Sequence, residues 1–305
     1  RFPAIIPNVS MCARGYKSEL GRARYLMSMR SWVQGQGSGV PRIVDKESPG
    51  GPRPLTLDPK KMELFPYSRL VQGWKRVRRG NLFEAGRAAD YPIYGWKCAG
   101  PGPAIYLSAG IHGDEPAGPM AVTRLLEDQP RWMRGFSWTI FPCLNPWGYE
   151  RDSRRNARRL DLNRLWRENR EPEIRAVRKL IHGRRFELAF LMHEDYDAKG
   201  FYLYELAPER APFGEKIVRA VRSIMVVETR RAIENRRVTA PGLIRRGPSH
   251  RPEGRRRWPE AFYLIDRHAA HLFTSETPST GFDLGLRIRA QIKGLRSALA
   301  LLRDL

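Results

Sequence analysis

The chain has 305 residues, of which 41% are hydrophobic, enough to bury the core of one large domain or two modest ones. Lys and Arg number 55 against 32 Asp and Glu, which gives a formal net charge of +23. No apolar run is long enough to span a bilayer, and the first residues lack a signal-peptide pattern, so we expect a cytoplasmic protein without a membrane span.

The basic charge raises the question of an acidic partner, such as nucleic acid, an anionic membrane surface or an acidic substrate. The basic residues are spread over the whole chain in short clusters such as 184–185 and 255–257. They are not interleaved with aromatic residues, as they are in surfaces that stack nucleic-acid bases. We therefore expect a solvated arginine-rich surface and no nucleic-acid partner. The three cysteines are sparse and share no metal-binding spacing, which suits free thiols in a reducing compartment.

Residues 1–61 differ from the rest of the chain. Glycine and proline punctuate positions 35–59, and few positions show helical or strand periodicity. Such a composition cannot bury enough apolar surface to fold by itself. We expect a disordered or loosely packed extension over 1–61, followed by a single domain over 62–305.

From residue 62 onward, patterns typical of strands and helices alternate. In chain order we predict strands at 91–97 and 104–109, a helix at 116–127, a strand at 137–141, a helix at 174–181, strands at 186–192 and 201–206, a helix at 217–225, a strand at 271–275 and an amphipathic helix over 288–302. This alternation favours an α/β fold with a largely parallel sheet.

Residues with metal-binding and acid–base side chains follow three of these strands. His112 and Glu115 come after 104–109, His193 after 186–192, and Glu276 after 271–275. In open α/β sheets, ligands lie beyond the carboxyl ends of the strands. We therefore expect these four side chains to converge at one edge of the sheet.

The first three of these residues form a ligand set for a metal. Hydrolytic zinc sites use three protein ligands and keep one position open for water, and His112, Glu115 and His193 supply two imidazoles and a carboxylate. Zinc makes bound water acidic and polarises a scissile carbonyl. An isolated His-x-x-Glu could instead cap a turn, but with the second strand-end histidine we predict one Zn²⁺ ion.

Other residues would complete a hydrolytic site. Glu276 is the predicted general base, since a carboxylate beside metal-bound water can take its proton and pass it to the leaving amine. Asp161 is the predicted partner that orients His112, because metal-bound imidazoles usually give their other N–H to a carboxylate. Glu194 and Asp195 are weaker candidates for such a role.

A substrate clamp is predicted from Arg154, Asn163 and Arg164. Arginine can bind a carboxylate through two parallel hydrogen bonds, and Arg154 could also hold the oxyanion formed during attack. The three residues follow the turn 145–148, in the runs 153–156 and 161–164. Arg155 is an alternative to Arg154 if the register differs by one.

These motifs resemble those of the zinc carboxypeptidase family and its relatives, the succinylglutamate desuccinylases and aspartoacylases, over roughly residues 90–300. The resemblance implies an α/β fold with a mixed, mostly parallel twisted sheet of eight strands flanked by helices. It also implies a role for each matched residue: zinc ligands His112, Glu115 and His193, catalytic Glu276, oxyanion-binding Arg154, carboxylate-binding Asn163 and Arg164, and Asp161 as the acidic partner of the first histidine. Residues 62–305 would then be one zinc-hydrolase catalytic domain.

Within this group, the chain looks most like bacterial murein peptide amidases, on the run Asn145-Pro146-x-Gly148. Arg159 departs from the pattern, because relatives often carry glycine there. The mobile active-site tyrosine of digestive carboxypeptidases has only candidate matches in Tyr202, Tyr204 and Tyr263.

Three functions are compatible with these features. The first is a metallocarboxypeptidase that hydrolyses an amide bond next to a free carboxylate, in small peptides such as those derived from the cell wall. The second is a deacylase of N-acyl amino acids, which would share the metal, the base and the clamp. The third is a non-catalytic basic binding protein, which would have no need of Glu276.

Overall fold

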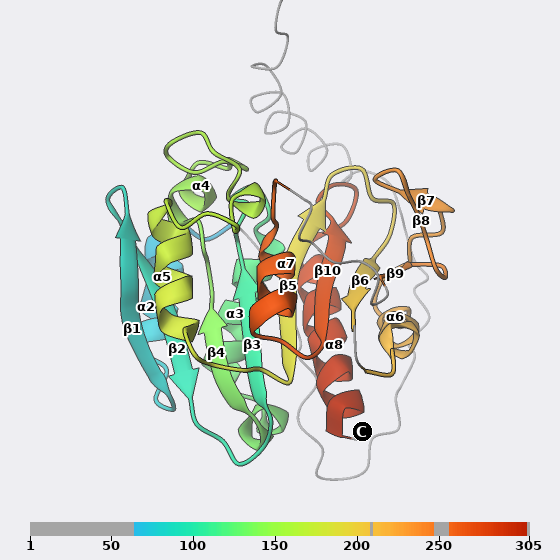
Figure 1. Cartoon of the computed structure of the whole chain (residues 1–305), viewed down its shortest axis with the longest axis horizontal. Helices are drawn as coiled ribbons and strands as arrows, with labels where there is room; N and C mark the ends of the chain where they lie inside the picture. Colours follow the sequence, from blue (N-terminus) through green and yellow to red (C-terminus); the bar gives the residue numbers. More distant parts are fainter. Residues whose placement is uncertain (1–63, 208–209, 247–255, 304–305) are drawn as a thin grey trace, which may run out of the picture. The chain divides into compact units, whose positions relative to one another are not determined.

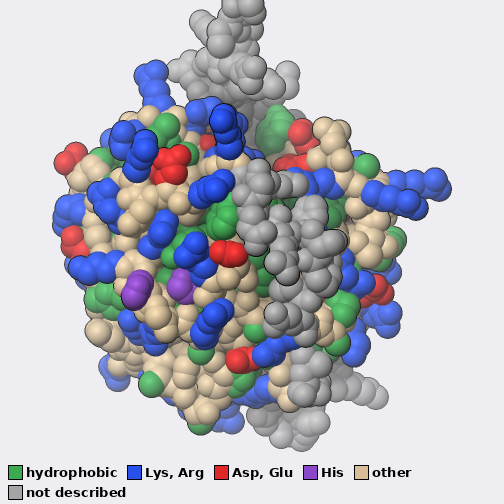
Figure 2. Space-filling view, viewed as in Figure 1, with side chains coloured by type: hydrophobic (Ala, Val, Ile, Leu, Met, Phe, Trp, Pro, Cys, Tyr) green, Lys and Arg blue, Asp and Glu red, His purple; other side chains and the backbone are tan. Residues whose placement is uncertain are grey.

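The computed structural model describes residues 64–207, 210–246 and 256–303 (Figure 1). The extension predicted over 1–61 lies outside these residues, so its boundary stays a prediction. Among the described residues, no helix has the length and apolar character needed to cross a bilayer. Lys and Arg side chains are spread over the viewed face and do not gather in one stripe (Figure 2).

An eight-stranded mixed sheet organises the described part of the chain. Its strands, in spatial order, are β1 (Asn81–Ala88), β2 (Tyr91–Cys98), β4 (Ser137–Phe141), β3 (Ala104–Ala109), β5 (Leu188–Asp195), β10 (Leu272–Pro278), β6 (Tyr202–Leu206) and β9 (Leu243–Arg246). The central strands β4, β3, β5 and β10 run parallel, whereas β1, β2 and β6 each pair antiparallel with a neighbour. The predicted fold class is confirmed.

Helices cover both faces of this sheet (Figure 1). One face packs against α5 (Pro172–Ile181) and α7 (Glu260–Arg267). The other packs against α2 (Tyr67–Lys75), α3 (Ala117–Asp128), α6 (Gly214–Val221) and α8 (Leu284–Arg303). The short elements are α4 (Pro146–Glu150), the 3-10 turns Arg131–Gly135 and Leu162–Arg164, and the hairpin of β7 (Ala232–Ile233) with β8 (Arg236–Arg237).

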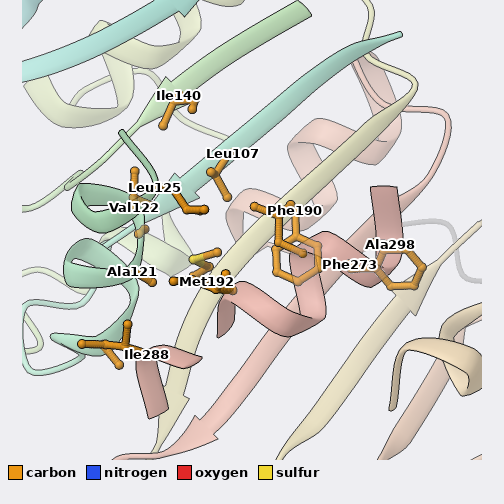
Figure 3. Packing of buried hydrophobic residues seen from close by; sticks show 14 of the residues in the cluster. Leu107, Ala121, Val122, Leu125, Ile140, Phe190, Met192, Phe273, Ile288 and Ala298 are labelled. Carbon is orange, nitrogen blue, oxygen red and sulfur yellow. The ribbon is translucent and has the colours of Figure 1, made fainter. Parts of the chain in front are cut away.

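The core is divided by the sheet into two apolar layers. Along β3, Ile105 and Leu107 belong to the layer under α3 and α8, while Tyr106 between them belongs to the layer under α5 and α7. Phe190 and Met192 of β5 pack with α3 and α8 in the same way (Figure 3). Because both faces are covered, the central strands read as continuous apolar runs.

The predicted elements are found with small shifts at their ends. Strands β5 and β10 run further than predicted, because their parallel pairing continues to Asp195 and Pro278. His193 and Glu276 therefore lie within strands, directly opposite each other in register, and not after the strand ends. The predicted helix at 217–225 ends at Val221, so Ile224 and Met225 lie beyond it. The sequence reading missed α2, β1, β9 and α7.

Candidate metal centre

The loop after β3 turns sharply because of two glycines. Gly110 has a φ of +65°, and a Cβ there would lie 2.7 Å from the Pro119 ring. Gly113 lies against the backbone of Gly148, where a Cβ would come within 1.9 Å of the Gly148 carbonyl carbon. The amide of Gly113 also donates to the carbonyl of Ser153. This close approach holds the loop against the segment that carries Arg154.

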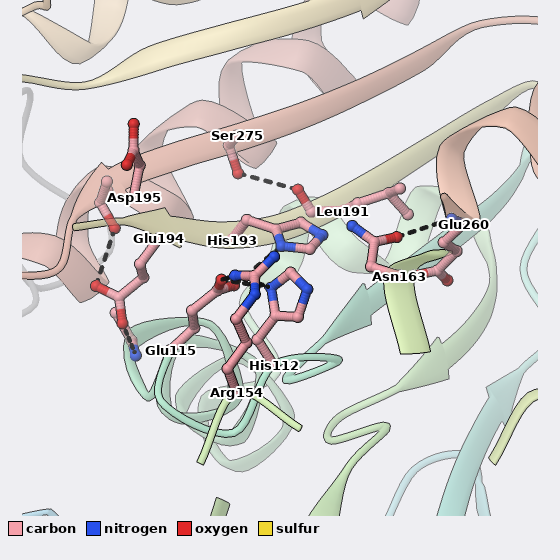
Figure 4. Close-up of polar contacts among 12 residues, drawn as sticks. His112, Glu115, Arg154, Asn163, Leu191, His193, Glu194, Asp195, Glu260 and Ser275 are labelled. Carbon is pink, nitrogen blue, oxygen red and sulfur yellow. Dashed lines mark hydrogen bonds and ion pairs between the residues drawn. The ribbon is translucent and has the colours of Figure 1, made fainter. Parts of the chain in front are cut away.

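His112, Glu115 and His193 converge at the end of this loop. The Glu115 carboxylate lies between the two imidazoles, with Oε1 2.5 Å from His112 Nδ1 and Oε2 2.9 Å from His193 Nδ1 (Figure 4). All three side chains are buried, and their potential ligand atoms lie within 4.8 Å of one another. Among the described residues, this is the one group of His, Cys, Asp or Glu with such geometry.

The chemistry of this group fits a metal cation. Burial raises the pKa of Glu115, but the two histidines outweigh it and hold that pKa well below its usual range. Burial lowers the pKa of His112, but Glu115 and Asp161 outweigh it and raise the value to about 9. Three buried side chains that attract positive charge thus face one point. Two imidazoles and a carboxylate are a ligand set that zinc takes in hydrolytic sites.

The second ring nitrogen of His112 faces Asp161. Its Nε2 lies 3.3 Å from Asp161 Oδ1, and Arg154 Nη2 lies 3.2 Å from Asp161 Oδ2. The same aspartate accepts a hydrogen bond from the amide of Asn163 and so caps the turn Leu162–Arg164. The ring of His112 is thereby fixed with Nδ1 toward Glu115.

A pocket of about 430 Å³ adjoins the metal-ligand group and contains the predicted clamp. Arg154, Asn163 and Arg164 all line it, together with the three metal-ligand candidates. Arg154 Nη1 lies 3.5 Å from Glu115 Oε1, and Asn163 Oδ1 accepts from the amide of Glu260. Arg164 lies beside Asn163 and donates to its carbonyl. Two guanidinium groups and an amide thus face one cavity with the metal-ligand group.

Glu276 lies in the wall of the same pocket. It stands opposite His193 in the pairing of β10 with β5. Burial, with the nearby charges of Glu115, Glu234 and Asp195, raises the pKa of Glu276 well above its usual range. A carboxyl group in this position holds a proton more readily than one in water.

The alternative candidates differ in their contacts, and Glu194 and Asp195 are among the residues that line the pocket. The carboxylate of Glu194 binds Arg287 at 2.7 Å, and that of Asp195 accepts from the Tyr202 hydroxyl at 2.9 Å. Arg155 is exposed and donates to the carbonyl of Arg159. Tyr202 and Tyr204 line the pocket. Tyr263, in contrast, stacks near Trp166 and His268.

The pocket is also lined by residues that the sequence reading missed, which we call its far wall. They are Glu234, Arg236, Arg246, Arg257 and Phe262. Glu234 accepts a hydrogen bond from the Tyr204 hydroxyl. It sits with Asn235 at the tip of the β7–β8 hairpin, where both residues have positive φ. Such turns usually contain Asn-Gly or Asp-Gly, so the pair Glu234-Asn235 does not mark a hairpin turn in the sequence.

Comparisons with known proteins agree with this geometry. Residues 101–199 match the profile of the succinylglutamate desuccinylase/aspartoacylase catalytic domain. A search of curated proteins finds no match.

Solved structures share the fold. A candidate metallopeptidase from Shewanella denitrificans OS217 superposes with a TM-score of 0.65 at 21% identity, covering 78% of this chain and 90% of that one. One from Shewanella amazonensis SB2B gives 0.64 at 22% identity, covering 77% and 92%. A Pseudomonas aeruginosa metallo-carboxypeptidase in complex with (2-guanidinoethylmercapto)succinic acid gives 0.57 at 17% identity, covering 78% and 68%.

These findings test the resemblance proposed from the motifs. The matched segment, residues 101–199 of this chain, contains His112, Glu115 and His193, which the structure brings together. The solved structures extend the likeness in fold to more than three quarters of the chain. The resemblance of this chain to the zinc carboxypeptidase-like group with its succinylglutamate desuccinylase relatives is therefore confirmed, and with it a metallohydrolase type of catalytic domain.

Proposed function

We propose that this protein is a zinc-dependent metallocarboxypeptidase, which hydrolyses an amide bond next to a free carboxylate. The observation that carries the proposal is one pocket containing His112, Glu115 and His193, a carboxyl group with a raised pKa, and the clamp residues. Small peptides from the cell wall are the proposed substrates, and the cytoplasm is the proposed location, since the cysteines are few and those described are free.

The proposed cofactor is one Zn²⁺ ion, held by His112, Glu115 and His193. When bound, zinc supplies an acidic water and polarises the scissile carbonyl. Asp161 keeps the His112 ring in place through Nε2. Such carboxylate partners typically account for ten- to hundredfold in metal affinity or activity.

Glu276 is the proposed general base and acid. Its raised pKa lets the carboxylate take a proton during attack and hold it until the amine leaves. Its place in the lining of the same pocket, opposite His193 in register, supports this role.

Arg154, Asn163 and Arg164 are the proposed substrate-binding residues. Asn163 and Arg164 would bind the free carboxylate, and Arg154 would stabilise the oxyanion that develops during attack. The two arginines line the pocket with Asn163 between them in sequence order. The Pseudomonas enzyme with the same fold was solved with a succinic acid derivative, which is consistent with carboxylate recognition.

A second candidate function is deacylation of N-acyl amino acids. The profile match over residues 101–199 favours it, because that profile describes succinylglutamate desuccinylases and aspartoacylases. The metal, the base and the carboxylate clamp would serve both reactions equally. The difference lies in which substrate fits the far wall of the pocket.

One experiment separates these functions. Purified protein is analysed for bound metal and then assayed on peptides with free C-termini and on N-succinyl and N-acetyl amino acids. We expect about one zinc per chain and hydrolysis of the peptides. Activity on the acyl amino acids alone would make the protein a deacylase. A zinc-free protein inactive on both panels, even after zinc is added, would refute a hydrolase.

A further inference from the structure

Helix α8 carries two buried polar side chains on its apolar face. Arg287 and Gln291 are one helical turn apart, and their exposed fractions are 2% and 0%. Their neighbours Ile288 and Leu295 belong to the apolar layer behind the sheet. Burying polar groups costs free energy unless they are hydrogen-bonded, and an apolar side chain would fill this space without that cost. What these two side chains bind therefore indicates why they are there.

Gln291 forms hydrogen bonds with both strands that carry site residues, β5 and β10. Its Nε2 donates to the carbonyl of His193 at 2.7 Å and lies 3.3 Å from Thr277 Oγ1. Its Oε1 accepts from the hydroxyl of Ser275. Ser275 and Thr277 flank Glu276 on β10, and side chains alternate between the faces of a strand. One amide thus holds the back of β10 at Glu276 and the back of β5 at His193.

Arg287 is linked through Glu194 to the chain segment that follows Glu115. Its Nη1 lies 2.7 Å from Glu194 Oε1 and 3.1 Å from the carbonyl of Ser279. The other oxygen of Glu194 accepts from the amide of Ala117 at 2.8 Å. Ala117 begins α3, two residues after Glu115. Arg287 and Glu194 thus connect α8 to the segment that carries Glu115.

We propose that Arg287 and Gln291 are positioning residues, which hold the backbone under His193, Glu276 and Glu115 from the side of the sheet opposite the pocket. The proposal rests on the zinc hydrolase function proposed above. Reaction rates depend strongly on the positions of catalytic groups, since displacing such a group by about 1 Å can lower the rate about a hundredfold. A buried hydrogen-bonded network fixes one arrangement more sharply than apolar packing does. Both side-chain polar atoms of Gln291 are hydrogen-bonded, whereas Nε of Arg287 has no partner among the described residues, so Gln291 carries more of the expected effect.

Gln291→Met tests this proposal, because methionine fills a similar volume but cannot bind His193, Ser275 or Thr277. We expect about tenfold weaker zinc binding in a chelator competition assay, and kcat lower by about ten- to hundredfold, with KM little changed. Weaker zinc binding is measured without substrate, so it reports on the ligand geometry alone.

Leu295→Ala is the matched control on the same face of α8. Leu295 is fully buried, so its truncation should leave a cavity and destabilise the fold. We expect this variant to have a lower Tm but wild-type zinc affinity and kcat. If Leu295→Ala loses zinc affinity as Gln291→Met does, the network is only part of general packing and the proposal is wrong.

The other possible results distinguish failure of the positioning role from failure of the proposed hydrolase function. If Gln291→Met binds zinc and turns over substrate like the wild type, the positioning role is refuted while the hydrolase function stands. If the wild type neither binds zinc nor hydrolyses substrate, the proposed function fails and the positioning role falls with it. Should Gln291→Met not fold, Thr277→Val removes a smaller part of the network. It should weaken zinc binding in the same direction, and unchanged affinity would refute the proposal.

Discussion

Replacing Glu276 with glutamine is the most direct test of the proposed base. Glutamine keeps the size of the side chain in the pocket wall but cannot accept and release a proton. Glu276 is not part of the group formed by His112, Glu115 and His193, so the variant should retain zinc. The whole effect should therefore appear in the chemical step.

The size of that effect follows from the role. General acid–base catalysis contributes about 10²- to 10⁴-fold, so kcat should fall by that factor, equivalent to about 2.7–5.5 kcal/mol in the barrier. KM should change little, because Asn163 and Arg164 remain to bind the carboxylate. The assay measures kcat and KM on the best peptide substrate, with zinc content determined on the same sample.

The same substitution should stabilise the metal-free protein. Burial and the nearby Glu115 raise the pKa of Glu276, so its ionisation near neutral pH favours unfolding. Glutamine removes that ionisation, and the Tm of the metal-free protein at neutral pH should rise. A variant with wild-type turnover would exclude Glu276 as the base. A variant without zinc would show that its carboxylate helps to hold the metal.

The remaining predictions concern the ligands, the clamp and one buried acid. His193→Ala should lose both zinc and activity, measured by metal analysis and peptide hydrolysis, and retained zinc would exclude it as a ligand. Asp161→Asn should weaken zinc binding about ten- to hundredfold in chelator competition, and unchanged binding would contradict its role beside His112. Arg164→Met should raise KM far more than it lowers kcat, whereas a loss confined to kcat would move Arg164 out of the clamp. Burial raises the pKa of Glu260 to about 7, so the contribution of Glu260 to stability should fall as pH rises from about 4.5 to 7. In thermal melts, Glu260→Gln should therefore gain stability relative to the wild type as pH rises through this range, and a pH-independent difference between the two would contradict the shift.

Local sequence signals explain why the sheet could be predicted. Its central strands are covered on both faces and therefore appear as unbroken apolar runs, such as the one ending at Met192. Strand β1 was not predicted from the sequence, because most of its positions are exposed or partly exposed and it therefore lacks such an apolar run. Helix α7 was missed because its N-cap residue is Pro259, whose side chain makes no capping hydrogen bond.

The metal-ligand candidates could be predicted because they lie in or beside those same strands. Side chains at the carboxyl ends of parallel strands meet at one edge of the sheet, so His112, just after β3, and His193, near the end of β5, could be placed there from their positions. The far wall of the pocket could not be predicted in this way. Glu234 belongs to the hairpin of β7 and β8, whose strands have two residues each. The position of so short a hairpin depends on long-range packing and not on a local pattern.

Glu194 shows where a sequence motif misleads most. It is adjacent to His193, and as part of His-Glu-Asp it looked like an accessory of the metal site. In a strand, however, adjacent side chains point to opposite faces, so the neighbour of a ligand is the residue least able to share its pocket face. The Glu194 carboxylate instead binds Arg287 and the amide of Ala117. Glu194 is among the pocket-lining residues, but its buried carboxylate is bonded to α8 and to the start of α3, so substitutions on that side of the sheet are expected to reach the site.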